Sequence, residues 1–132
     1  MRATRRSVMA LAGGLLLIAS NAMAAELVLF ELAGCPWCTI WNRTIGPIYP
    51  KSEVGRRAPL RRVALGDGIP AGLTLKGPIR YTPTFVLVEE GREVDRIEGY
   101  SGEDFFWARI ELWSAGGRLR LDRAWELPEA HV

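Results

Sequence analysis

Gly34-Cys35-Pro36-Trp37-Cys38 contains both cysteines of the chain and follows the apolar run Leu27-Val28-Leu29-Phe30. A proline just inside a helix start costs no hydrogen bond, because the N–H at that position has no partner within the helix. This order of residues predicts a strand that ends near Glu31, a tight turn at Ala33-Gly34 and a helix that opens at Cys35. One sulfur would then lie at a helix N-terminus, where unpaired N–H groups and the helix dipole favour a thiolate.

The first 24 residues have the pattern of an export signal. A positive start, an apolar run and a small-residue cleavage pattern follow one another: Arg2 to Arg6, Val8 to Ala19 and Ala22-Met23-Ala24. The apolar run is shorter than the roughly 20 residues that span a bilayer. We therefore expect a signal peptide over 1–24, one mature domain over 25–132 and a periplasmic location. An uncleaved signal that tethers the protein to the membrane is the alternative.

The charge balance argues against a nucleic-acid partner. The chain has 17 basic and 15 acidic residues, and loss of the three leader arginines leaves 14 basic residues, so the mature protein is close to neutral. A net charge close to zero gives no indication that the protein binds nucleic acid or another phosphate-rich surface. Export to an oxidising compartment would let two close cysteines form a disulfide. We expect a monomer.

Apolar runs and turn signals predict the other elements. Strands are expected over 60–65, 84–88 and 93–98, a second helical segment over 50–57, a helical turn around 70–75 and a last helix after Ser101-x-x-Asp104 that ends at Gly116-Gly117. The helix after Cys35 has four apolar residues on one stripe, at a spacing close to the helical period, namely Trp37, Trp41, Ile45 and Ile48. The residues from about 114 form a charged tail. The result is an α/β domain with a four-stranded mixed sheet flanked by helices.

This order of elements, with C-P-W-C at the first helix and Tyr81-Thr82-Pro83-Thr84 before the third strand, resembles the thioredoxin superfamily and its three-layer fold. The chain is more narrowly similar to the SoxS-type periplasmic thioredoxins of bacterial sulfur-oxidation systems. The similar stretches are Gly46-Pro47, Arg57-Ala58-Pro59-Leu60-Arg61, residues 81–87 and Gly102-Glu103-Asp104-Phe105-Phe106-Trp107.

The two cysteines carry the predicted chemistry. Cys35 is the expected nucleophile, which attacks a partner disulfide, and Cys38 is the expected resolving cysteine, which breaks the mixed disulfide. An inert staple is the first alternative, but so short a loop removes little entropy from the unfolded chain. A zinc site is the second, but four ligands are needed and the chain adds one histidine, His131. We expect no metal and no cofactor.

The resemblance implies further site residues. It implies that Pro83 is a cis proline that packs against the cysteine pair and leaves the backbone of Thr82 free to pair with an extended substrate. Trp37 should be exposed and available to a partner, whereas Trp41 should lie in the core. Thioredoxins bury an acid six residues before the first cysteine, but this chain has Leu29 there. Glu31 is therefore the candidate proton acceptor for Cys38, unless it simply faces solvent.

The predicted function is that of an exported thiol–disulfide oxidoreductase. It would reduce a disulfide or a mixed thiol adduct on a partner protein, which the resemblance implies is a sulfur-oxidation component, and an unidentified electron donor would reduce it in turn. Two alternatives stay open. One is a DsbA-like thiol oxidant, because the motif does not fix the direction of electron flow. The other is a non-catalytic binding module on a thioredoxin scaffold.

Overall fold

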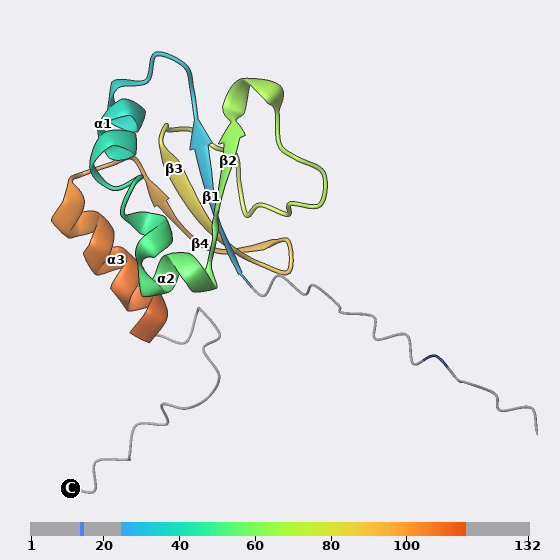
Figure 1. The fold of residues 1–132 in the computed structure, drawn as a ribbon. Coiled ribbons are helices and arrows are strands. Elements are labelled where there is room, and N and C mark those ends of the chain that lie inside the picture. Colours follow the sequence, from blue (N-terminus) through green and yellow to red (C-terminus); the bar gives the residue numbers. More distant parts are fainter. Residues whose placement is uncertain (1–13, 15–24, 116–132) are drawn as a thin grey trace, which may run out of the picture.

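The computed structural model describes Gly14 and residues 25–115 (Figure 1). The expected signal peptide, His131 and almost all of the expected tail lie outside the described residues. The elements follow in the order β1 (Glu26–Glu31), α1 (Pro36–Thr44), η1 (Tyr49–Lys51), α2 (Glu53–Arg57), β2 (Leu60–Ala64), η2 (Leu65–Asp67), β3 (Thr84–Glu89), β4 (Arg92–Glu98) and α3 (Glu103–Ala115). None of the helices over this part of the chain is long and apolar enough to cross a membrane.

The four strands form one mixed sheet in the order β2-β1-β3-β4 (Figure 1). β1 is parallel to β2 and antiparallel to β3, and β3 and β4 form an antiparallel hairpin around Glu90-Gly91. The central strand β1 is buried on both faces, which explains its unbroken apolar run. The predicted α/β class and the four-stranded mixed sheet are confirmed.

Two apolar clusters cover the two faces of the sheet. The larger joins the sheet to α1, η1 and α3, and its members are Ala25, Leu27, Leu29, Trp41, Ile45, Tyr49, Ala58, Phe85, Leu87, Ile97, Tyr100, Phe106, Ile110 and Trp113. The smaller lies on the other face and packs under the irregular segment 65–80; its buried members are Val28, Phe30, Val63, Val86 and Val88. Helices therefore cover one face, and a long connection covers the other.

Two local expectations are wrong. The helical turn around 70–75 is absent, because this segment turns at Ala71-Gly72 and then forms a bridge between Thr74 and Arg92. α3 begins at Glu103, and the Phe106 N–H donates a hydrogen bond to the Gly102 carbonyl oxygen. The residue directly before the helix is therefore Gly102, with a φ of 105°, and not Ser101. Of the apolar stripe that begins in α1, Trp41 and Ile45 are in the core, whereas Trp37 and Ile48, which lies beyond the end of α1 at Thr44, are exposed.

A β-bulge in β4 explains an irregular spacing in the sequence. Leu87 pairs with Asp95 and Val88 pairs with Glu93, so Val94 is an extra residue on β4. Beyond a bulge, residues three apart can share a face of the strand. Val94 and Ile97 accordingly both pack on the larger cluster, and Glu93 and Arg96 meet each other as an ion pair.

Candidate active site

The sheet brings two distant segments together at one edge. β1 and β3 are antiparallel, with Phe30 opposite Thr84, so the carboxyl end of β1 and the amino end of β3 coincide. Cys35 follows β1 after a short turn in which Gly34 has a φ of 78°. Thr82 and Pro83 directly precede β3. The predicted cysteine motif and the predicted proline segment therefore meet.

Cys35 is the N-cap residue of α1, with Pro36 in the first turn after it. Its backbone is extended (φ −76°, ψ 112°), and the N–H of Cys38 donates a hydrogen bond to Cys35 Sγ over 3.2 Å. A backbone donor and the positive end of the helix dipole both stabilise negative charge on this sulfur. The opening expectation, a sulfur at the start of the first helix, is confirmed.

The two sulfurs form a disulfide, and they differ in access to solvent. Cys38 is 4% exposed, whereas Cys35 is half-buried. A partner sulfur can reach Cys35 more readily than Cys38, and this asymmetry fits the predicted order of attack. The roles of the two residues stay predictions.

Thr82 lies directly against Cys35. The Thr82 carbonyl oxygen is 3.3 Å from Cys35 Sγ, a distance at which the thiol of the reduced form can donate a hydrogen bond. The peptide bond between Thr82 and Pro83 is cis. Within residues 25–115 the Thr82 N–H donates no hydrogen bond, so it is free to meet an incoming chain.

The segment around Thr82 is held on its carboxyl side. The Thr84 hydroxyl donates to the Tyr81 carbonyl oxygen over 2.6 Å, and the Gly99 N–H donates to the Pro83 carbonyl oxygen over 2.8 Å. Both contacts tie the segment to the β3–β4 side of the sheet. The position of the Thr82 carbonyl is therefore fixed by the fold on that side.

Glu31 takes part in a polar network instead of standing free in solvent. Its Oε1 accepts hydrogen bonds from Asn42 Nδ2 over 2.7 Å and from Arg62 Nη1 over 3.0 Å. The three side chains connect β1, α1 and β2. No hydrogen bond joins Glu31 to either cysteine in this part of the chain, so its role as proton acceptor stays a prediction. Leu29, two residues earlier, is fully buried in the larger cluster.

Two exposed aromatic side chains flank the parts of the site: Trp37 lies between the cysteines, and Tyr81 precedes Thr82 in the sequence. Trp37 is 57% exposed and Tyr81, beside Thr82, is 58% exposed, while Trp41 is fully buried. The expected exposure of Trp37 and burial of Trp41 are confirmed. Tyr81, Asn42 and Arg62 were not predicted as site residues. Only Tyr81 carried a signal, because it directly precedes the Thr82-Pro83 pair.

Metal binding finds no support in the described part of the chain, where no group of three or more histidine, cysteine or acidic side chains could hold an ion. What the arrangement can do is redox chemistry at sulfur. A half-buried sulfur at a helix start, a buried sulfur within bonding reach and an adjacent free backbone N–H together suit thiol–disulfide exchange.

Comparison with solved structures places the chain beside thioredoxins. The periplasmic thioredoxin SoxS from Paracoccus pantotrophus, solved in its reduced form, is 45% identical to this chain and superposes with a TM-score of 0.64. The match covers 66% of this chain and 92% of that one.

Two more distant structures share the fold. Fasciola hepatica thioredoxin is 23% identical with a TM-score of 0.54, and the match covers 72% of this chain and 86% of that one. Chlamydomonas reinhardtii thioredoxin f2 is 15% identical with a TM-score of 0.50, with 70% and 81% covered. No protein-family model and no curated protein matches the chain.

Proposed function

Because this chain belongs to the thioredoxin superfamily and is a thiol–disulfide oxidoreductase, we propose that it is an exported reductant of one partner protein. The signal peptide over 1–24 would be removed, and the domain from residue 25 would act in the periplasm. The observation that carries the proposal is the placement of Cys35 Sγ, at the N-cap of α1 and against the Thr82 carbonyl.

The reaction follows from the two sulfurs. The Cys35 thiolate attacks one sulfur of the partner disulfide, that disulfide breaks, and the leaving sulfur takes up a proton. Cys38 then loses its proton and attacks Cys35 Sγ in the mixed disulfide, which releases the second partner sulfur as a thiol. Two electrons pass to the partner, and the enzyme is left with the Cys35–Cys38 disulfide.

The backbone at Thr82 would orient the partner. Its free N–H can pair with an extended chain that carries the target disulfide, and the exposed rings of Trp37 and Tyr81 offer apolar contact beside it. Such backbone pairing needs no particular partner side chain, because main-chain groups supply the hydrogen bonds. Specificity would then come from the exposed aromatic rings.

The partner and the donor are proposed by class. Similarity to a periplasmic thioredoxin named SoxS supports a component of sulfur oxidation as partner, whose cysteine is held as a disulfide or mixed thiol adduct. After each turnover the Cys35–Cys38 disulfide must be reduced again. A thiol donor on the periplasmic side would supply those two electrons.

Cysteine variants test the redox role. Cys35→Ser should abolish reduction of the partner, whereas Cys38→Ser should trap a mixed disulfide that is visible by mass spectrometry without reductant. If Cys35→Ser keeps full activity towards the partner, the protein acts as a binding module and the redox proposal is wrong.

The redox potential tests the direction of electron flow. Equilibration with glutathione should give a potential close to that of thioredoxin, about −270 mV, whereas a potential of about −120 mV would make the protein a DsbA-like oxidant.

Secretion is tested separately, by the N-terminal sequence of the protein from a periplasmic extract. Ala25 is the expected first residue.

A further inference from the structure

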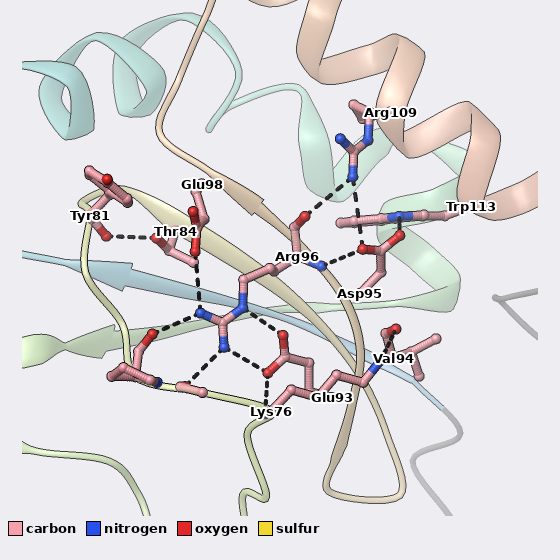
Figure 2. Close-up of polar contacts among 12 residues, drawn as sticks. Lys76, Tyr81, Thr84, Glu93, Val94, Asp95, Arg96, Glu98, Arg109 and Trp113 are labelled. Carbon is pink, nitrogen blue, oxygen red and sulfur yellow. Dashed lines mark hydrogen bonds and ion pairs between the residues drawn. The ribbon is translucent and has the colours of Figure 1, made fainter.

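Two charged side chains of β4 hold the segment that leads to Thr82. Glu93 Oε2 accepts a hydrogen bond from the Lys76 N–H over 2.7 Å (Figure 2). Arg96 donates from Nη2 to the Gly77 carbonyl oxygen over 3.0 Å and from Nη1 to the Pro78 carbonyl oxygen over 2.9 Å. Three consecutive residues of the segment are therefore fixed by this one pair.

The pair is itself rigid. Arg96 Nε lies 2.6 Å from Glu93 Oε1 and Arg96 Nη2 lies 2.8 Å from Glu93 Oε2, so the two side chains form a two-pronged ion pair. The Arg96 side chain is 16% exposed and the Glu93 side chain is 2% exposed. Glu98, at 3.5 Å from Arg96 Nη1, adds a second carboxylate on the solvent side (Figure 2). The guanidinium has little freedom to move, because its fork geometry is satisfied on several sides.

The held segment reaches the redox site within a few residues. Pro78 is bound by Arg96, Ile79 packs against the smaller apolar cluster, and the Tyr81 carbonyl is bound by Thr84. Thr82 comes next and touches Cys35 Sγ. On the amino side the N–H of Thr74 donates to Gly91, which ties the segment to the hairpin. The Glu93–Arg96 pair is thus the anchor of residues 76–78 on the amino side of Thr82.

We propose that Glu93 and Arg96 are positioning residues of the redox site. They fix residues 76–78 of the segment that leads to Thr82, and so they set where the Thr82 carbonyl and N–H lie when a protein disulfide meets Cys35. This role rests on the proposed function. Replacement of a buried ion pair by apolar residues is often neutral for stability. A positioning role does require the guanidinium, because its planar fork of N–H donors bonds the Gly77 and Pro78 carbonyl oxygens and Glu93 at the same time.

The test compares two substrates. Arg96→Gln should raise the KM for insulin, a protein disulfide, on the order of tenfold, because misplacement of a positioning group weakens productive binding. The rate with 5,5′-dithiobis(2-nitrobenzoate), a small disulfide that needs no backbone pairing, should change less than about twofold. Arg96→Lys should behave like Arg96→Gln, because an ammonium cannot reproduce the fork.

Alkylation of Cys35 by iodoacetamide gives a readout without any partner. The Thr82 carbonyl accepts a hydrogen bond from the neutral thiol, so its displacement should lower the pKa of Cys35. The pH midpoint of alkylation should therefore fall in Arg96→Gln. Glu93→Gln, which keeps the side-chain shape, should shift the KM and the midpoint in the same directions by less.

Arg57→Gln is the matched control. The change of residue is the same, but Arg57 pairs with Glu53 within α2, and the pair Glu93–Arg96 keeps its contacts with residues 76–78. This variant should leave the insulin KM and the alkylation midpoint unchanged. If Arg96→Gln and Arg96→Lys match Arg57→Gln in both readouts, the pair is purely structural and the proposal is wrong. Failure of the wild-type protein to reduce insulin would instead count against the proposed function, and the alkylation midpoint would still decide the positioning role.

Discussion

Trp41 is the residue around which the larger cluster packs. Its ring lies 5.0 Å from the ring of Phe85 and 5.7 Å from that of Phe106, between centroids, and the Arg62 guanidinium lies 5.9 Å from its ring. The indole N–H is buried, and no group in the described part of the chain accepts its hydrogen bond. The ring is therefore held by packing and by the Arg62 guanidinium over its face, and not by a hydrogen bond of its N–H.

Substitution at Trp41 should separate ring packing from the N–H group. Trp41→Ala should cost about 3–5 kcal/mol of unfolding free energy, because the cavity cannot close fully. Trp41→Phe keeps aromatic contact and removes an unpaired donor, so it should cost about 1–2 kcal/mol. Urea unfolding followed by circular dichroism measures both. Equal costs would mean that aromatic contact with Phe85 and Phe106 contributes little.

Gly55 is required by a close backbone approach. A Cβ at this position would overlap the carbonyl oxygen of Tyr49 and would lie 3.0 Å from Ser52 Oγ. Ser52 caps α2 by accepting a hydrogen bond from the Gly55 N–H over 2.9 Å. The glycine therefore lets η1 and α2 pack together.

Gly55→Ala should lower the unfolding free energy by about 1–3 kcal/mol, as overpacking does. In an ordinary helix position the same change would be favourable by about 1 kcal/mol. Gly66→Ala is the matched control, because a Cβ at Gly66 meets nothing within 4 Å. Thermal unfolding of both variants decides the matter: a neutral Gly55→Ala would show that the η1–α2 junction relaxes freely.

Elements were predictable where one local pattern determines them. The apolar run of β1 and the Glu90-Gly91 turn identified the strands, and Cys35-Pro36 identified the start of α1. The bulge in β4 was visible only as an irregular spacing of Val94 and Ile97, because a period of two makes no allowance for an extra residue. The segment 65–80 has four glycines after Leu65, and its path depends on contacts with β4. Local propensity could not supply that path.

The site was predictable to the same extent. Cys35 and Cys38 are neighbours in the sequence, and the resemblance supplied Thr82 and Pro83. The contacts of Arg96 with Gly77 and Pro78, and of Arg62 with Glu31, join residues between 18 and 31 positions apart. No short-range pattern encodes such pairs, and they depend on the sheet order that brings the strands together.

Asp95 docks α3 onto the sheet. Its Oδ2 accepts a hydrogen bond from Trp113 Nε1 over 2.9 Å, and Trp113 is 1% exposed. Asp95→Ala would leave a buried indole N–H without this acceptor and should cost about 1–3 kcal/mol, whereas Asp95→Asn keeps an acceptor and should cost less. In a Trp113→Phe background the cost of Asp95→Ala should shrink, as a double-mutant cycle in urea would show. An undiminished cost would mean that Asp95 stabilises the fold through its contacts with Arg109 and the Arg96 N–H and not through Trp113.

At the scale of the whole molecule, the Glu93–Arg96 pair links acid stability to the arrangement of the redox site. Burial raises the pKa of the Glu93 carboxyl, but the hydrogen bonds from Arg96 and the Lys76 N–H, with the positive charges of both side chains, outweigh burial. The pKa of Glu93 in the folded protein therefore lies below its ordinary value. Hydrogen bonding to Glu93 likewise raises the pKa of Arg96, which stays charged.

The sign of the pH dependence follows from that lowered pKa. A carboxyl whose pKa is lower in the folded than in the unfolded state binds fewer protons when folded, so its stabilising contribution is complete above the unfolded pKa, about 4.3. The contribution is lost as the pH falls through the lower folded pKa. The wild-type unfolding free energy should therefore fall below about pH 4.3, and Glu93→Gln should lose less over the same range.

Urea unfolding at steps from pH 7 down to pH 2.5 measures both slopes. Arg96→Gln should flatten the acid limb as well, because removal of the guanidinium takes away the largest interaction that lowers the pKa of Glu93. The stability difference between wild type and Glu93→Gln should then be greatest at neutral pH and should narrow in acid. Parallel curves for the two proteins would mean that the Glu93 carboxylate gains nothing from its partners on folding. In that case residues 76–78 would be held by their hydrogen bonds alone and not by charge.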